Sequence, residues 1–275
     1  MALGNTATRV LVSILAIPLI LAACFYGGIP FLIFVFGIGL VSFYEFSELT
    51  KNKDAYVNFP LGILTVIVII ANSYYGFIET NIVLIIATVL ILLFELFRNR
   101  SSAIINVGTT LLGILYLGML SSTILLIREF FNKSEMLYPE GGFLIISIMV
   151  SIWVCDSAAF FLGSAFGKHK LFPRISPNKS WEGAIAGFIF AVIGMIAAKI
   201  LVLDYLTWQD VIVIGIIAGT IGQLGDLVES MIKRDAKVKD SSALIPGHGG
   251  IFDRFDSLLL TAPVVYLYLY FFVSY

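Results

Sequence analysis

The chain has 275 residues, of which 59% are hydrophobic and 13% are charged, and its formal net charge is −1 at pH 7. A soluble globular domain is about 45–50% apolar and about 25% charged, so the composition excludes a soluble globule. The mean hydropathy of +1.00 supports the same conclusion. We therefore predict an all-α polytopic integral membrane protein.

A helix that crosses the hydrocarbon core of a bilayer needs about 20 predominantly apolar residues. Nine stretches meet this requirement, in chain order 9–26, 28–47, 56–77, 80–98, 104–127, 142–166, 183–203, 208–230 and 256–274. They leave little sequence for a soluble domain, and neither internal repeats nor Pro-rich linkers are evident. We expect about nine transmembrane helices in a single membrane domain over residues 1–275.

The distribution of Lys and Arg indicates the orientation, because positive residues are retained in cytoplasmic loops. If the N-terminus is cytoplasmic, the alternation of nine spans leaves only Arg128, Lys133 and Lys199 on or near the outer side. We therefore predict a cytoplasmic N-terminus and an outside C-terminus. The two most basic loops, 167–182 and 230–256, then share the cytoplasmic face, where nucleotides are available.

A polar cluster separates the last two apolar stretches. Residues 230–256 read S-M-I-K-R-D-A-K-V-K-D-S-S-A-L-I-P-G-H-G-G-I-F-D-R-F-D. A passive loop has no need of P-G-H-G-G followed by two carboxylates three residues apart. The segment therefore indicates chemistry on a charged substrate at a membrane.

Carboxylates also occur inside the expected spans, where an ionisable residue costs about 2.5–3.5 kcal/mol at a helix centre and is functional by default. Asp156 shares a helix face with Ala159, Gly163 and Gly167. This small-residue face suits close packing against another helix or a substrate.

A second span carries Asp226 and Glu229, and Lys233 follows them at helical spacing, so the three lie on one side of a helix. The alternative for each carboxylate is a structural hydrogen bond that locks two helices together. Their convergence on the same loops favours function.

Four carboxylates are candidate metal ligands: Asp226, Asp253, Asp256 and Asp156. Their oxygens suit a hard divalent cation such as Mg²⁺, with water and substrate phosphates completing the coordination shell. There is no Cys/His cluster of the kind that holds zinc. Asp253 is also well placed as the N-cap of the last helix, a structural role that can coexist with metal binding.

Glycines and cations accompany these carboxylates. Gly249 and Gly250 free the backbone for an anion-binding nest or a tight turn. Metal ions and basic side chains neutralise the transferring group in phosphoryl chemistry. The candidate cations of this segment are Lys233, Arg234, Lys239 and Arg254.

A second cytoplasmic loop, 167–183, contains the run S-P-N-K-S-W-E-G. Its basic residues alone would suit a solvated loop that attracts anionic lipid headgroups. The run itself indicates a tightly ordered loop with substrate-binding candidates. These candidates are Ser176, Lys179, Ser180 and Glu182.

The segment 230–256 resembles the signature of the phosphatidate cytidylyltransferases, also called CDP-diacylglycerol synthases. The matching positions are Ser230, Lys233, Arg234, Lys239, Asp240, Pro246, His248, Gly249, Gly250, Asp253, Arg254 and Asp256. The loop 175–183 and Asp156 are also similar to that family, so motifs fall within residues 142–275, whereas residues 1–141 carry none. One departure is Phe160, where the family pattern has a tyrosine.

The resemblance implies an enzyme of phospholipid biosynthesis in which CTP and phosphatidate give CDP-diacylglycerol and pyrophosphate. It implies Mg²⁺, as one or two cations, as the cofactor and an in-line attack without a protein nucleophile. The implied location is the inner (plasma) membrane, with a cytoplasmic active site. The expected partners are CTP, phosphatidate and the lipid bilayer, with no nucleic acid, and family resemblance suggests a homodimer.

The resemblance also implies residue roles. The catalytic set would be Lys233, Arg234, Lys239, Asp240, His248 and Arg254. The substrate-binding set would be Ser176, Lys179, Ser180, Glu182, Gly249 and Gly250. His248 would either contact a phosphate or form hydrogen bonds within its loop.

Two other functions fit part of the pattern. An ion-coupled or proton-coupled transporter also has carboxylates in its spans, but it would hold its charges near the midplane between broken, repeated helices. A CTP-dependent lipid kinase uses similar substrates and transfers the γ-phosphoryl group instead. The identity of the product separates the kinase from the cytidylyltransferase.

Overall fold

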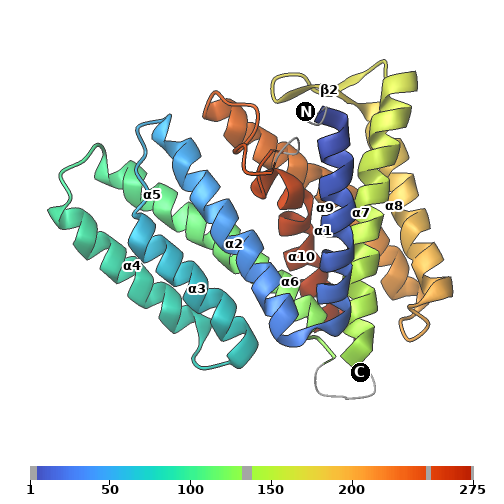
Figure 1. The fold of residues 1–275 in the computed structure, drawn as a ribbon, viewed down its shortest axis with the longest axis horizontal. Helices are drawn as coiled ribbons and strands as arrows, with labels where there is room; N and C mark the ends of the chain where they lie inside the picture. The colour runs from blue at the N-terminus through green and yellow to red at the C-terminus, as the bar shows by residue number, and fades with distance from the viewer. Residues whose placement is uncertain (1–4, 132–137, 246–248, 274–275) are drawn as a thin grey trace. The chain divides into compact units, whose positions relative to one another are not determined.

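The computed structural model describes residues 5–131, 138–245 and 249–273, with side chains from Val12 onward. Helices make up most of this part of the chain (Figure 1). They are α1 (Asn5–Tyr26), α2 (Gly28–Lys51), α3 (Phe59–Tyr75), α4 (Thr80–Phe97), α5 (Ala103–Gly113), the π-helical stretch η1 (Ile114–Met119), α6 (Leu120–Arg128), α7 (Tyr138–Phe166), α8 (Trp181–Leu201), α9 (Trp208–Asp235) and α10 (Phe252–Phe272).

Seven helical stretches of the described residues are long and apolar enough to cross a membrane. They are Gly28–Lys51, Thr80–Phe97, Ala103–Arg128, Tyr138–Phe166, Trp181–Leu201, Trp208–Asp235 and Phe252–Phe272. Two shorter apolar helices, Val12–Tyr26 and Phe59–Tyr75, fall in the other expected spans. The prediction of a helical membrane protein with many spans is confirmed, whereas the count of nine and the side of each terminus stay predictions.

The all-α expectation needs one correction, because the basic loop before α8 forms a small antiparallel sheet. Strand β1 (Lys170–Phe172) pairs with β2 (Ser176–Ser180), with Lys170 opposite Ser180 and Phe172 opposite Ser176. Pro173 lies in the connection, where its fixed φ favours a turn. A hairpin this short carries no clear alternation of apolar and polar residues, so hydropathy does not reveal it.

The chain divides into two compact units. The first consists of Met1–Ala23, Gly27–Leu126 and Ile232–Phe255. The second consists of Cys24–Tyr26, Ile127–Met231 and Asp256–Tyr275. Helices α9 and α10 therefore contribute residues to both units. The expectation of a single membrane domain stays a prediction.

In the first unit, α2, α3, α4 and α5 run side by side (Figure 1). Phe43 and Phe46 of α2 are buried in its core. A Cβ atom on Gly113 of α5 would lie 2.9 Å from the ring of Phe43. The glycine therefore lets α5 approach these rings closely, which maximises contact between helices that lipid alone would not drive together.

In the second unit, α7 packs along α8 through small residues. A Cβ atom on Gly183 would lie 2.7 Å from the carbonyl oxygen of Ala159 and 3.0 Å from the Cα of Gly163. A Cβ atom on Gly187 would lie 2.9 Å from the carbonyl oxygen of Cys155. The small-residue face predicted on α7 is therefore confirmed as a helix-packing surface.

Arg128 stabilises the second unit from its core. Its side chain is fully buried and donates to the carbonyl oxygens of Cys24 (2.5 Å), Phe25 (2.8 Å) and Tyr138 (3.1 Å). A buried guanidinium requires such acceptors, because an unpaired charge away from water is strongly unfavourable. Arg128 thereby joins the end of α1 to the beginning of α7.

Candidate active site

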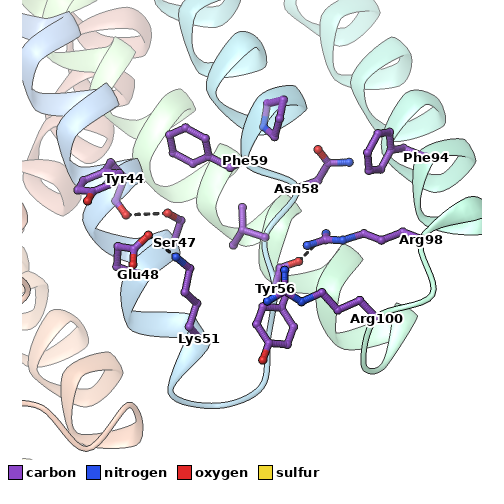
Figure 2. A pocket seen from close by; sticks show the side chains of 12 residues that line it. Tyr44, Ser47, Glu48, Lys51, Tyr56, Asn58, Phe59, Phe94, Arg98 and Arg100 are labelled. Atoms are coloured by element: carbon purple, nitrogen blue, oxygen red, sulfur yellow. Dashed lines mark hydrogen bonds and ion pairs between the residues drawn. The ribbon is translucent and has the colours of Figure 1, made fainter.

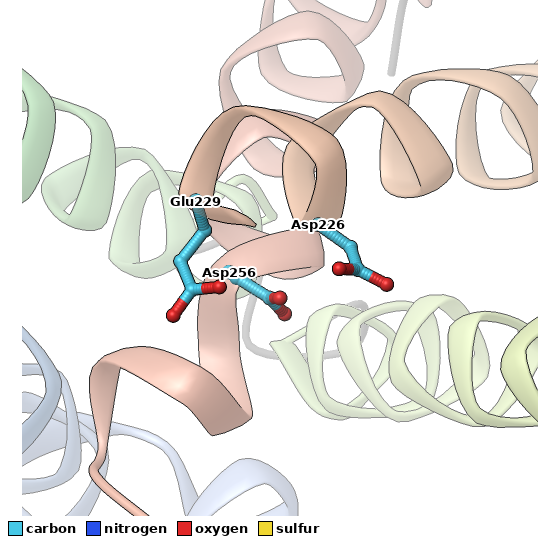
Figure 3. A group of neighbouring side chains, drawn as sticks. All are labelled: Asp226, Glu229 and Asp256. Carbon is cyan, nitrogen blue, oxygen red and sulfur yellow. The ribbon is translucent and has the colours of Figure 1, made fainter. Parts of the chain in front are cut away.

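Three carboxylates of the second unit converge (Figure 3). Asp226 and Glu229 lie one turn apart on α9, and Asp256 projects from α10. Each offers one oxygen, and these oxygens all lie within 4.8 Å of one another. Glu229 is buried, and the other two side chains are half-buried. We call these three residues the carboxylate group.

Close packing of two helices produces this convergence. A Cβ atom on Gly225 would lie 2.7 Å from the carbonyl oxygen of Asp256, so the backbones of α9 and α10 nearly touch there. A Cβ atom on Gly222, one turn earlier, would lie 3.4 Å from Oγ1 of Thr261. Small residues thus bring the carboxylates of separate helices within reach of a common ligand.

The carboxylate group can bind a metal ion. Negative charges this close repel one another, and a cation among them relieves the repulsion. All the donor atoms are hard oxygens, which suit Mg²⁺ or Ca²⁺ and leave room for water and substrate ligands. Sequence reasoning placed Asp226 and Asp256 among the metal ligands but treated Glu229 only as a neighbour on the same helix face.

Lys179 of β2 contacts the carboxylate group. Its Nζ atom lies 2.5 Å from Oδ2 of Asp226, and both side chains are about one third exposed. Ser230 Oγ donates to Oδ1 of the same carboxylate at 3.3 Å. The hairpin therefore brings a predicted substrate-binding lysine to a predicted metal ligand, an arrangement that neither sequence position reveals.

Three other residues of this loop make contacts that order it. Ser180 is the N-cap of α8, because its Oγ accepts from the backbone N–H of Gly183 at 3.2 Å. Glu182 accepts from the backbone N–H of His169 at 3.2 Å and lies 2.7 Å from Nδ1 of that ring. Ser176 pairs with Phe172 in the sheet. Their roles in substrate binding stay predictions.

Asp156 does not belong to the carboxylate group that the described residues form. It lies on α7 with an exposed side chain, and Phe160, one turn later, is 67% exposed. A metal-binding role for Asp156 stays a prediction.

In the first unit, Asp253 organises the loop before α10. Its carboxylate accepts from Lys233 Nζ (2.7 Å), from the backbone N–H (2.9 Å) and Oγ (2.9 Å) of Ser241, and from the backbone N–H of Gly250 (2.8 Å). Only 5% of the Asp253 side chain is exposed. Asp253 lies inside the first turn of α10 and accepts from residues that precede the helix, so it is not a conventional N-cap. Its role as a metal ligand stays a prediction.

Two glycines make this loop possible. Gly249 has a φ of +81°, and a Cβ atom there would lie 2.7 Å from Oδ2 of Asp253. A Cβ atom on Gly250 would clash with Ser241 Oγ and with the carboxylate of Glu45. The backbone N–H of Ile245 donates to the carbonyl of Gly249 at 2.9 Å. Residues 246–248, which include the predicted His248, lie outside the described residues.

Sequence reasoning missed Glu45, the buried carboxylate of α2 that holds this loop. Its oxygens accept from the backbone N–H groups of Ile251 (3.0 Å) and Phe252 (2.8 Å) and from the hydroxyls of Ser241 (3.2 Å) and Ser242 (2.5 Å). Glu45 is 1% exposed. A carboxylate at the start of α10 also interacts favourably with the positive end of the dipole of that helix. The sequence feature that indicates Glu45 is its position as an acidic residue within the expected apolar span 28–47.

The other predicted cations of the segment 230–256 are solvent-exposed. Arg234 donates to the carbonyl of Val238 at 3.1 Å. Lys239, Asp240 and Arg254 are exposed. Their catalytic roles stay predictions.

A family model described as the cytidylyltransferase family matches residues 7–272. The chain belongs to this family. The phosphatidate cytidylyltransferase of Bacillus subtilis is 33% identical over 266 residues, which cover 95% of this chain and 96% of the relative. That of Brucella suis is 33% identical over 270 residues, covering 97% and 94%. The Haemophilus influenzae relative of the same name is 48% identical over 139 residues, about half of each chain. The family resemblance inferred from the segment 230–256 is confirmed.

We predict that Glu45→Ala loosens the loop before α10 in this cytidylyltransferase. Each buried donor that loses its acceptor costs about 1–3 kcal/mol, and Glu45 accepts from two backbone N–H groups and two serine hydroxyls. Hydrogen–deuterium exchange of the peptide that covers 241–252 should therefore accelerate. Glu48→Ala on the same helix is the control, since Glu48 is exposed and pairs with Lys51. Unchanged exchange in Glu45→Ala would refute this role.

Proposed function

We propose that the protein transfers the cytidylyl group of CTP to phosphatidate and thereby forms CDP-diacylglycerol for phospholipid biosynthesis. The observation that carries this proposal is the carboxylate group with Lys179 beside Asp226. Relatives named phosphatidate cytidylyltransferase that align over nearly the whole chain support the choice of substrates.

The carboxylate group fits a divalent cation, and we propose Mg²⁺, as one or two ions, held by Asp226, Glu229 and Asp256. Asp253 and Asp156 are further candidate ligands. When bound, the cation would neutralise charge on the reacting phosphates and orient them. The donor set supports this choice, since all its members are hard carboxylate oxygens at close range.

The proposed reaction needs no protein nucleophile. A phosphate oxygen of phosphatidate forms a bond to the α-phosphorus of CTP, and the bond from that phosphorus to the oxygen bridging to the β-phosphate breaks. The electron pair leaves with pyrophosphate. The residues contribute by positioning the two anionic substrates in line and by neutralising their charge.

The basic residues of the segment 230–256 would bind the triphosphate. Lys233 is held by Asp253 at 2.7 Å, which fixes its direction. Arg234, Lys239 and Arg254 would supply solvent-exposed positive charge, together with Asp240 of the same segment. Gly249 and Gly250 would shape the loop that carries these cations, and His248 would contact a phosphate or its own loop.

Lys179 would release Asp226 and bind a substrate phosphate instead. Its ammonium group would form the ion pair with Asp226 in the free protein and the ion pair with the phosphate in the complex. Ser176 would add a hydroxyl from the same strand. Ser180 and Glu182 would act by holding the hairpin in place, through the cap of α8 and the contact with His169.

We further propose nine spans in one membrane domain, with a cytoplasmic N-terminus, an outside C-terminus and the active site on the cytoplasmic side of the inner membrane. The predominance of Lys and Arg on one side of the predicted topology supports this orientation. A homodimer is the proposed oligomer.

A label-transfer assay tests the proposed reaction. Purified protein in lipid is incubated with phosphatidate, Mg²⁺ and CTP labelled at the α-phosphate. We expect the label in the organic phase, with release of pyrophosphate. Label that appears in aqueous CDP would identify a lipid kinase instead, and intact CTP alongside an active control enzyme would exclude both reactions.

The variant Asp256→Asn tests the metal site. We expect the rate of cytidylyl transfer to fall by about two orders of magnitude or more, comparable with the loss of a strong electrostatic stabiliser of the transition state. Expression and helical content should be unchanged, because asparagine has nearly the same shape. The control Asp210→Asn alters another acidic residue of α9, whose carboxylate accepts hydrogen bonds from the hydroxyls of Tyr268 and Thr207. Wild-type turnover in Asp256→Asn would refute the metal assignment.

Cysteine labelling tests the orientation. Both native cysteines are buried, so single cysteines can be introduced at exposed positions. We expect a membrane-impermeant reagent to modify Lys237→Cys only from the cytoplasmic side and Glu79→Cys only from the outer side. The reversed pattern would overturn the proposed topology.

A further inference from the structure

A cavity lined by none of the residues assigned to the reaction lies in the first unit (Figure 2). It has a volume of about 390 Å³ and is lined by the end of α2, the connection to α3, the first residues of α3 and the end of α4 with the residues just after it. Cavities of about 300–1,000 Å³ are typical of small-ligand sites.

A buried donor in this cavity lacks a partner among the described residues. Asn58 is 2% exposed, and its Nδ2 atom forms no hydrogen bond with them. The amide orientation is fixed, because Oδ1 accepts from the backbone N–H of Leu61 and caps α3. Figure 2 shows the amide nitrogen on the side of Phe94, another lining residue. An unsatisfied buried N–H is unfavourable by about 1–3 kcal/mol, so the site favours a ligand that accepts this hydrogen bond.

Three basic residues and one acidic residue, Glu48, line the same cavity. Arg98 donates to the carbonyl of Tyr56 at 2.9 Å, and Arg100 lies over the Tyr56 ring at 3.7 Å from its centre. Lys51 pairs with Glu48, and Arg98 with Glu95. Arg100 has no ion pair within the part of the chain that is described, so it is the cation best able to receive an anion.

Aromatic and apolar surface adjoins these polar groups. Phe94 and Tyr44 line the cavity and are each about half exposed. Leu90, one turn before Phe94 on α4, and Leu64, one turn after Pro60 on α3, are also exposed. An exposed apolar face on a membrane-spanning helix contacts lipid chains, so a ligand with a phosphate and acyl chains satisfies both parts of the site.

We propose that this cavity binds the phosphate of an anionic phospholipid, with Asn58 Nδ2 and Arg100 as its donors and the exposed faces of α3 and α4 beside its acyl chains. The connection that forms one wall is also fastened to the segment 230–256. Asn52 donates to the carbonyl of Ala236 at 3.4 Å, and Lys53 pairs with Asp235 at 3.1 Å. These two contacts join the connection to the end of α9.

Native mass spectrometry of the full chain with dioleoyl phosphatidylglycerol tests the proposal. Asn58→Asp keeps the oxygen that caps α3 but replaces the donor by a negative charge, and Arg100→Gln removes the cation. Each should weaken binding of phosphatidylglycerol by about tenfold or more, the effect of losing one charge-assisted hydrogen bond. Arg174→Gln, which removes an exposed cation of the hairpin, is the matched control and should bind like the wild type.

Three results would overturn the proposal. Equal binding by the wild type, Asn58→Asp and Arg100→Gln would exclude this cavity as the site, and Arg100→Gln remains informative if the buried variant fails to fold. Equally tight binding of phosphatidylcholine would exclude a requirement for an anion. A rise in melting temperature with inorganic phosphate or glycerol phosphate as large as that with phosphatidylglycerol would identify a soluble phosphate, not a lipid, as the ligand.

Discussion

The buried carboxylate of Glu45 is the constraint on which the order of the basic segment depends. Its oxygens satisfy two backbone N–H groups at the start of α10 and two serine hydroxyls of the preceding loop. A buried charge of this kind is tolerated only when donors surround it, and the donors in turn are left unsatisfied without it. A loop rich in glycine and lysine would otherwise be mobile. The N-terminal helices, which carry no catalytic motif, therefore contribute directly to the geometry of the segment that does.

Small residues perform a complementary task in the second unit. Gly225 brings the backbones of α9 and α10 into contact, and Asp226, Glu229 and Asp256 then face a common point. Three carboxylates so close to one another favour a cation, and Lys179 supplies the nearest positive charge. Carboxylates beside a lysine are the kinds of group that phosphoryl chemistry uses to hold cations and to neutralise anionic substrates. The close packing of α9 and α10 thus stabilises a group of carboxylates whose mutual repulsion alone would separate them.

The sequence predicted the helices well, because apolar stretches of membrane length are a strong and local signal. It also predicted the small-residue face of α7, since helical spacing follows directly from residue number. The hairpin at 170–180 escaped it, because two short strands give no periodic pattern. Glu45 escaped it as well: an acidic residue near the end of an apolar span resembles an ordinary interfacial residue until its partners, about two hundred positions away, are known.

The sequence by itself determined that this is a helical membrane protein of the cytidylyltransferase family, because composition and a long motif depend only on residue identity and order. Only the tertiary structure decided which carboxylates meet. In the tertiary structure, Glu229 lies beside Asp226 and Asp256. Asp253 accepts hydrogen bonds from Lys233 and Ser241. Lys179 forms an ion pair with Asp226. The physical reason is that such contacts depend on how closely helices pack and how loops turn between them, and these distances are set by side chains far apart in the chain.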